Sequence, residues 1–160
     1  MNVRPLRADE IDRLIDDLWL PFAREMADLD AYNELAADVR ADAYSYRQAK
    51  LSDESTAIFV ATVDDELAGY VRVTADQTPP VFARGPEATI GEVYVAPSHR
   101  GDSLATALLD RAESWAEDRG CEYATLSVNE RNETAQAVYD AREYSLRRYK
   151  MDKRLGSRVD

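Results

Sequence analysis

The stretch that decides the fold reads Val93-Tyr94-Val95-Ala96-Pro97-Ser98-His99-Arg100-Gly101-Asp102-Ser103-Leu104-Ala105. A β-branched and aromatic run ends at Val95, and Pro97 then turns the chain, so we predict a strand followed by a tight turn. Apolar residues recur at helical spacing over residues 102–119, which predicts a helix that Gly120 ends.

The turn before this helix is a candidate anion site. The first amides of a helix have no acceptor within the helix, and the helix dipole is positive at that end. Arg100 adds a charge, Gly101 lets a ligand approach the backbone, and the small Ser103 and Ala105 keep the first turn open. An ordinary strand-to-helix turn capped by Asp102 accounts for the same residues equally well. The chain has no P-loop motif and no Gly-x-Gly-x-x-Gly motif, so neither of those phosphate sites is supported.

The length of the chain indicates the number of domains, and its net charge excludes some classes of partner. The 160 residues fit one domain, and we predict a single domain over residues 1–152 with a polar tail at 153–160. The net charge of -11 repels nucleic acid and anionic membranes, so we expect neither as a partner. No apolar run has the length of a membrane span, and no secretory signal opens the chain. These features predict a cytoplasmic protein.

The side-chain inventory disfavours metal chemistry. Cys121 is the only cysteine and His99 the only histidine, which excludes an internal disulfide and disfavours a zinc site. No carboxylates are grouped at a ligand spacing, so we expect no metal. The lysines are only Lys50, Lys150 and Lys153. Many acids with few lysines predict a halophile-like surface, although an acidic surface that attracts a cationic substrate is the alternative.

Hydrophobic periodicity predicts an α/β layered domain with a mixed sheet. A helix is expected from a cap at Asp9, with its apolar side chains at Ile11, Leu14, Ile15 and Leu18, and Pro21 should break or restart it. A weaker helical pattern, with Val39, Ala43 and Tyr46 on one side, covers residues 34–50. The remaining expected elements are strands at 3–6, 56–63, 67–74, 89–95, 123–128 and 144–151, a turn at Asp64-Asp65, and a helix over 132–142.

Three segments of this chain resemble segments of the GNAT superfamily of N-acetyltransferases, and they follow one another along the chain in the order that the family has. Arg100, Ser103 and Ala105 occupy the marked positions of its Arg/Gln-x-x-Gly-x-Gly/Ala signature, with Ser103 in place of glycine. Residues 59–71 are similar to the central hairpin of the family, and residues 132–139 match its Asn-x-x-Ala-x-x-Leu/Phe-Tyr pattern. Gly-Phe usually follows that pattern, where this chain has Glu143-Tyr144. The resemblance covers residues 56–151 well.

This resemblance implies a mixed, mostly antiparallel central sheet with helices on both faces, and acetyl-CoA as the cosubstrate. The backbone of Val93 and Val95 would pair with the pantetheine amides, as an added strand does. The side chain of Asn132 would contact the cofactor as well as cap its helix. The cofactor-binding residues implied in this way are Val93, Tyr94, Val95, Arg100, Gly101, Asp102, Ser103, Leu104, Ala105, Thr106, Asn132 and Tyr139.

Two residues are candidates for catalysis. The resemblance assigns Tyr139 as the general acid for the departing thiolate, whereas its apolar helix face also suits a half-buried core tyrosine. Glu92 lies on the strand that leads to the turn, on the face opposite Val93 and Val95. Its carboxylate could take the proton from an ammonium acceptor, although a solvated strand glutamate explains it equally well.

We therefore predict an N-acetyltransferase in which a primary amine attacks acetyl-CoA directly. The alternative is a non-catalytic acyl-CoA-binding sensor or interaction module on the same fold, which Ser103 and Glu143-Tyr144 keep open. A nucleotide-binding protein is a second alternative. The acceptor is a small-molecule or peptide amine that the sequence does not identify, and the resemblance makes a homodimer plausible.

Overall fold

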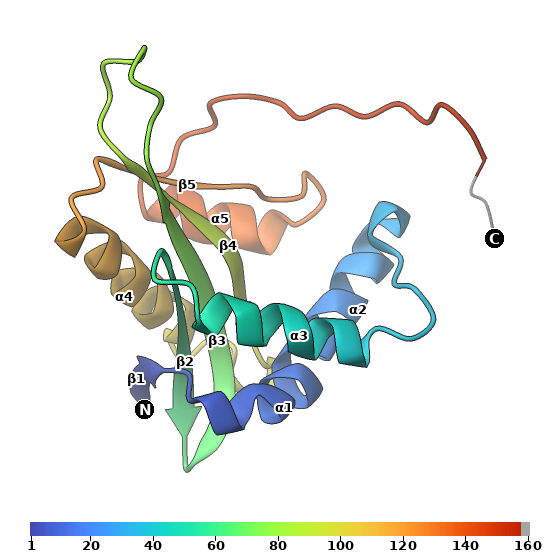
Figure 1. Cartoon of the computed structure of the whole chain (residues 1–160). Coiled ribbons are helices and arrows are strands. Elements are labelled where there is room, and N and C mark those ends of the chain that lie inside the picture. Colours follow the sequence, from blue (N-terminus) through green and yellow to red (C-terminus); the bar gives the residue numbers. More distant parts are fainter. Residues whose placement is uncertain (158–160) are drawn as a thin grey trace.

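A five-stranded sheet forms the centre of the protein in the computed structural model, which describes residues 1–157. The strands lie in the order β1-β2-β3-β4-β5, and all neighbours are antiparallel except the parallel pair β4 and β5 (Figure 1). The sheet is therefore mixed and mostly antiparallel, as predicted. The strands are β1 (Asn2–Pro5), β2 (Thr56–Val63), β3 (Glu66–Asp76), β4 (Glu87–Val95) and β5 (Tyr123–Leu126).

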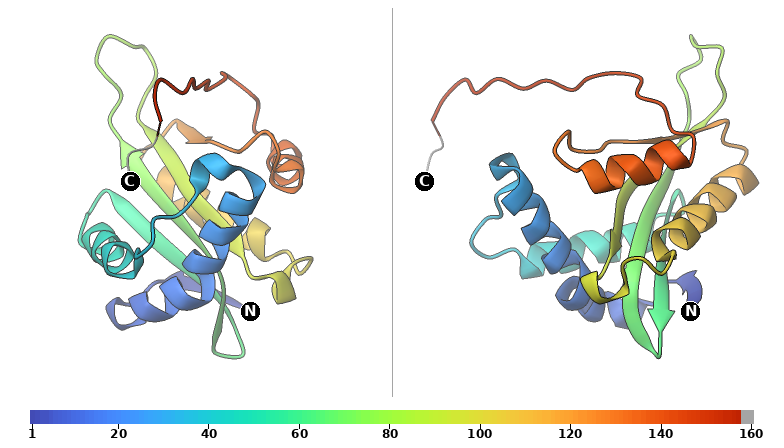
Figure 2. Two further views of the ribbon diagram at one scale, coloured as in Figure 1. Left: turned by 90° about the vertical axis from the view of Figure 1, so that its right-hand side faces the viewer. Right: turned by 180° about the vertical axis from the view of Figure 1, so that it is seen from behind.

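Helices cover both faces of this sheet, and each face has its own apolar core (Figure 2). One face carries α4 (Leu104–Asp118) and α5 (Glu133–Ala141). The other carries α1 (Ile11–Leu14), the π-helical η2 (Ile15–Trp19), α2 (Leu20–Leu29) and α3 (Arg40–Leu51). Short 3-10 turns complete the chain at η1 (Ala8–Glu10), η3 (Ala31–Asn33) and η4 (Pro97–His99).

The N-terminal helices bury the side chains that the sequence predicts. Ile11, Leu14, Ile15 and Leu18 are all fully buried. Pro21 neither breaks nor restarts the helix, because α1, η2 and α2 follow one another without interruption. The π-helical turn lies just before Pro21, where it accommodates the missing N–H.

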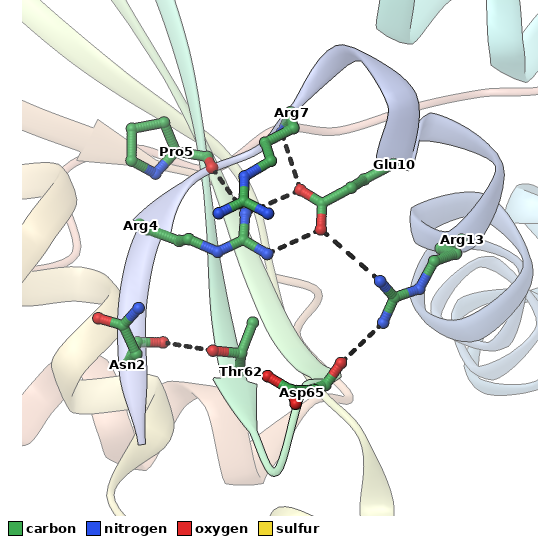
Figure 3. Close-up of polar contacts among 8 residues, drawn as sticks. All are labelled: Asn2, Arg4, Pro5, Arg7, Glu10, Arg13, Thr62 and Asp65. Atoms are coloured by element: carbon green, nitrogen blue, oxygen red, sulfur yellow. Dashed lines mark hydrogen bonds and ion pairs between the residues drawn. The ribbon is translucent and has the colours of Figure 1, made fainter.

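The expected cap at Asp9 is wrong, because the neighbouring Glu10 anchors this helix start. Its buried carboxylate accepts the Arg7 N–H at 2.9 Å and pairs with the Arg4 guanidinium at 2.7 Å (Figure 3). Arg13 completes the cluster by bonding the Asp65 carbonyl of the β2–β3 turn at 3.0 Å. The Arg4 hydrogen bond lowers the Glu10 pKa to about 2 despite its burial. The cluster therefore ties the first helix to β1 and to the hairpin.

The central hairpin has the predicted turn. Asp64 and Asp65 both have positive φ, 51° and 64°, as a two-residue hairpin turn requires. Gly69 in β3 lies where β3, β4 and α4 approach closely. A Cβ there would lie 2.7 Å from the Tyr94 carbonyl oxygen and 3.1 Å from a Leu108 methyl. The early glycine of the hairpin is therefore a packing requirement.

We expect Gly69→Ala to lower the free energy of unfolding by about 1–3 kcal/mol, because backbone must move to admit the methyl group. Gly85→Ala is the control, since its Cβ would meet only the Glu122 side chain at an ordinary 3.5 Å. Urea unfolding of both variants measures the difference. Equal stability of the two would contradict the close approach.

Two elements differ from the sequence-based expectation. The predicted helix over residues 34–50 starts only at Arg40, and its buried face carries Ala43 and Arg47, while Tyr46 is exposed. The expected apolar side is therefore right at Ala43 and wrong at Tyr46, because the charged Arg47 is the side chain that is buried. The expected strand over residues 144–151 is also wrong, since no strand forms after α5 within the described residues. From Ser145 on, its residues are exposed and pair with no strand among residues 1–157.

Candidate active site

One edge of β4 has no partner strand, among the described residues, at the positions where the sequence predicts the candidate site. The pairing of β4 with β5 ends at Ile90 opposite Leu126, so the remaining part of β4 has no partner on that side among the described residues. The Tyr94 carbonyl faces β3, and the Ala96 N–H bonds the Ala68 carbonyl of β3 at 2.8 Å. Because backbone groups alternate along a strand, those of Val93 and Val95 point to the open side.

The turn after β4 presents backbone amides near the Val95 end of that edge. Gly101 and Ser103 both have positive φ, 92° and 63°, and α4 begins at Leu104 rather than at residue 102. The first helical bond runs from the Ala107 N–H to the Ser103 carbonyl at 3.1 Å. The N–H groups of Leu104, Ala105 and Thr106 therefore precede the first helical donor, so they have no acceptor within the helix and are available to an anion.

Asp102 does not cap this helix. Ser103 is the N-cap residue, and no side chain bonds the helix start. Asp102 is exposed, so its charge lies in solvent. The ordinary turn capped by Asp102, which the sequence allowed, is therefore not the structure observed.

Arg100 is held beside this turn by two partners. Its Nε donates to the Val95 carbonyl at 3.0 Å, and its Nη2 bonds Glu25 of α2 at 2.8 Å. Its guanidinium lies 5.4 Å from the centre of the Tyr94 ring. The ion pair with Glu25 is partly exposed, and such pairs contribute little to stability. A diphosphate could therefore displace Glu25 from Arg100 at low cost.

The backbone at residue 103 explains the glycine that the family signature has there. A left-handed conformation suits glycine and is unfavourable for other residues. We expect Ser103→Gly to raise the free energy of unfolding by about 0.5–1 kcal/mol, and Ser103→Val to lower it by about 1–2 kcal/mol. Thermal unfolding of the two variants measures both effects. A glycine variant less stable than the parent chain would contradict the strain.

Helix α5 places Asn132 and Tyr139. Asn132 caps the helix as predicted, because its side chain accepts the Ala135 N–H at 3.1 Å. Tyr139 is half-buried and packs against the same apolar core as Val93 and Ala105. Its hydroxyl has no hydrogen-bond partner among residues 1–157, and burial raises its pKa. The hydroxyl therefore stays protonated at neutral pH and is free to donate.

The residues that replace Gly-Phe keep the geometry of that pair. Glu143 has a φ of 69°, the conformation that favours glycine. Its N–H bonds the Asp140 carbonyl, and the Tyr144 N–H bonds the Tyr139 carbonyl at 3.0 Å, which closes α5 with a Schellman turn. The Tyr144 ring lies 5.8 Å from the Tyr139 ring, so an aromatic residue still supports Tyr139 from this position.

Glu92 lies on the other face of the sheet, as the strand alternation predicts. Both oxygens of its carboxylate bond Arg47 of α3, and Arg72 Nε of β3 bonds it at 3.2 Å. Burial raises the pKa of this carboxyl, but the two arginines outweigh burial and the net shift is downward. The carboxylate is therefore a poor acceptor for a proton and a strong partner for the two guanidinium groups.

Aromatic rings surround the buried member of this cluster. The Arg47 side chain is 2% exposed, and its guanidinium carbon lies within 6 Å of the ring centres of Trp19, Tyr46 and Tyr70. These contacts add a cation–π attraction to the ion pair. Sequence reasoning missed Arg47 because it ranks arginine as a surface residue. The one sequence feature that indicates the burial of Arg47 is its i+4 spacing from the apolar Ala43.

Metal ligands, membrane-spanning helices and pockets among residues 1–157 bear on the nature of the site. No group of three or more His, Cys, Asp or Glu side chains is placed to hold a metal ion, and no helix is long and apolar enough to cross a membrane. A pocket of about 580 Å³ lies between β2 and α4, and none of the predicted site residues lines it. The candidate site is an open strand edge that leads to a helix start.

Comparison with known proteins agrees with this arrangement. Residues 11–144 match the model of the Acetyltransferase (GNAT) family. An uncharacterized N-acetyltransferase of Archaeoglobus fulgidus is 28% identical over 143 residues, which are 89% of this chain and 92% of that protein. A structure described as a predicted acetyltransferase with acetyl-CoA, from Clostridium acetobutylicum, has a TM-score of 0.75 at 20% identity and covers 96% of both chains. The aminoglycoside N-acetyltransferase AAC(6')-Iy with CoA has a TM-score of 0.71 at 16% identity and covers 98% of this chain and 100% of that one. The chain belongs to the Acetyltransferase (GNAT) family.

Proposed function

We propose that this protein transfers an acetyl group from acetyl-CoA to a primary amine by direct attack on the thioester. The observation that carries the proposal is the edge of β4 at Val93 and Val95 that β5 does not cover, on which the Val95 carbonyl accepts Arg100 Nε. This edge leads to the amides of Leu104, Ala105 and Thr106, which have no acceptor within α4. The strand edge suits the pantetheine amides, and the helix start with Arg100 suits the diphosphate. Solved structures of similar fold contain acetyl-CoA or CoA.

Different residues would then stabilise the oxyanion, protonate the leaving group and bind the cofactor. An amide of Val95 or a neighbour would stabilise the oxyanion formed as the amine attacks. Tyr139 would give its proton to the departing thiolate. The backbone from residues 101 to 106 and the side chain of Asn132 would hold the rest of the cofactor. This route needs no metal and no cysteine nucleophile.

The place of Glu92 in this scheme changes from the sequence-based expectation. Its lowered pKa makes it a weaker base than a free glutamate. We propose instead that Glu92 forms a structural ion pair with Arg47 and Arg72 on its face of the sheet, and that the amine loses its proton to water.

A thiol-release assay tests the proposal. Purified protein with acetyl-CoA is offered small amines, polyamines, amino acids, aminoglycosides and peptides, and free thiol is measured against an amine-free control. We expect release with at least one class. Tight CoA binding by calorimetry with no turnover on any amine would favour the sensor, and tighter binding of ATP than of CoA would favour a nucleotide-binding protein. The predicted halophile-like surface makes assays at low and at high salt advisable.

A further inference from the structure

Positive charges gather around the Tyr46 ring, on the face of the sheet that α3 crosses (Figure 1). The guanidinium carbons of Arg47 and Arg72 lie 5.3 and 5.6 Å from the centre of that ring, and Lys50 Nζ lies 5.4 Å from it. Glu92 pairs with both arginines, whereas Lys50 has no ion pair or hydrogen bond among residues 1–157. This cluster therefore has three cations and one carboxylate, in a chain whose net charge is -11.

Arg72 is the member of the cluster that keeps free hydrogen-bond donors. Its one hydrogen bond among residues 1–157 runs from Nε to Glu92 at 3.2 Å, so its Nη1 and Nη2 groups have no acceptor there. Glu92 does not depend on Arg72 alone, because Arg47 bonds both oxygens of the carboxylate. The Arg72 side chain is 17% exposed, against 2% for Arg47, so a ligand from solvent can reach it. A guanidinium with two free N–H groups suits a carboxylate, which accepts both.

Gly91 determines where this guanidinium lies. The pairing of β3 with β4 shifts at this point, and Gly91 is the extra residue of a β-bulge, without a partner on β3. A Cβ on Gly91 would lie 2.6 Å from Arg72 Cζ and 2.8 Å from its Nη1. The guanidinium thus occupies the space that a side chain at residue 91 would fill.

This position lies beside the strand edge that would hold acetyl-CoA. Gly91 comes directly after Ile90, where the pairing of β4 with β5 ends. Two residues of a strand span about 7 Å, so the Arg72 guanidinium over Gly91 is about the length of an amino acid from the backbone of Val93. We propose that the acceptor is an amine that also carries a carboxylate, as an amino acid does, and that Arg72 binds this carboxylate. The proposal rests on the acetyltransferase function proposed above.

Local charge favours this class of acceptor over an amine without an acid group. Polyamines and aminoglycosides carry several positive charges and no carboxylate, so the cluster would repel them at short range. The acidic remainder of the surface attracts such cations from a distance, but salt at 0.15 M screens exposed charges beyond about 8 Å. An amino acid satisfies both conditions, because its carboxylate meets the arginine while its amine stays free to react.

Paired substrates test the carboxylate. In the thiol-release assay, α-, β- and γ-amino acids are each compared with the corresponding carboxamide and with the decarboxylated amine. Phenylalanine, phenylalaninamide and phenethylamine form one such set. We expect kcat/KM for the best amino acid to exceed that for its amide by about 10–100-fold, as a hydrogen bond between charged groups provides. Equal or better use of the amides and amines would overturn the carboxylate site and leave the acetyltransferase proposal standing.

Two variants assign the carboxylate to Arg72. Arg72→Met removes the guanidinium, and Gly91→Ala displaces it while its charge remains in the chain. Both should lower the preference for amino acid over amide by about 10-fold or more. The preference is a ratio measured on one sample, so partial unfolding of a variant does not change it. An unchanged preference in Arg72→Met would show that this arginine does not bind the acceptor.

Arg111→Met is the matched control for the lost charge. Arg111 belongs to α4 on the other face of the sheet, where its guanidinium carbon lies 4.8 Å from the centre of the Phe59 ring. This variant loses the same charge far from the cluster and should keep the preference. A loss equal to that of Arg72→Met would mean that net charge, and not a site at Arg72, selects the acceptor.

Binding without turnover separates the carboxylate site from the acetyltransferase proposal. Calorimetry measures the affinity of an N-acetyl amino acid and of its amide for the protein saturated with CoA. We expect the parent chain to bind the acid at least about 10-fold more tightly than the amide, and Arg72→Met to bind the two alike. This preference without turnover of any amine would contradict the acetyltransferase only. Equal affinity of the parent chain for acid and amide, or no binding of either, would overturn the carboxylate site.

Discussion

Replacement of Tyr139 by phenylalanine is expected to lower turnover by about 100-fold while CoA affinity changes little, an effect at the lower end of the range for general acid catalysis. The lower end is appropriate because a thiolate is already a good leaving group. Tyr139 Oη has no hydrogen-bond partner among the described residues, and burial raises its pKa. The variant therefore loses a proton donor and no structural bond. Thiol release at saturating acetyl-CoA measures turnover, and calorimetry measures CoA affinity.

Tyr144→Phe is the matched control for this change. It removes the same atom from a neighbouring ring, 5.8 Å away, whose hydroxyl bonds Glu113 at 2.8 Å. This variant should lose about 1 kcal/mol of stability through the missing hydrogen bond and keep its turnover. Equal turnover of Tyr139→Phe and the parent chain would show that Tyr139 is a core residue only.

The sequence predicts most strands and both faces of the sheet because their apolar patterns are local. The turn at Asp64-Asp65, the early glycine of the hairpin and the cap at Asn132 are also local, and each is confirmed. The start of α4 was misplaced by two residues, since composition does not show that Ser103 adopts a left-handed conformation.

Features that depend on distant partners could not be predicted in this way. Arg47 is buried because Glu92, 45 residues away in sequence, neutralises it, and a pattern of apolar residues contains no such information. The segment 144–151 has a strand pattern but no strand beside it within the described chain. The site residues from Val93 to Thr106 were identified through the family signature, and their contacts with a cofactor stay predictions.

Removal of Arg47 is expected to have the largest effect on stability. Arg47→Met leaves the Glu92 carboxylate buried with only Arg72 as its partner, and such a loss costs about 3–5 kcal/mol. Glu92→Gln, which leaves Arg47 unpaired, should be destabilising for the same reason. The double variant Arg47→Met/Glu92→Gln should recover much of the loss, because only Arg72, which is less deeply buried than Arg47, then lacks its carboxylate partner. Urea unfolding of the four proteins forms a double-mutant cycle, and additive losses would contradict the coupling.

The stability difference between the parent chain and Arg47→Met should change with pH in one direction. The folded-state pKa of Glu92 lies below its ordinary value, so its ion pair stabilises the parent chain above the unfolded pKa of about 4.3. That contribution is lost as the pH falls through the lowered folded pKa. The stability gap between the parent chain and Arg47→Met should therefore be largest near neutral pH and shrink on acidification.

The same double variant decides between the two roles of Glu92. If Glu92 were the general base, its replacement would lower turnover by about 10²–10⁴-fold. The double variant would show the same loss of turnover even though it folds. If Glu92 and Arg47 form only a structural ion pair, the folded double variant should keep a turnover near that of the parent chain. We expect the second result, because the two arginines hold the Glu92 carboxylate in its ionised, weakly basic form. A large loss of turnover in a fully folded double variant would instead identify Glu92 as the base.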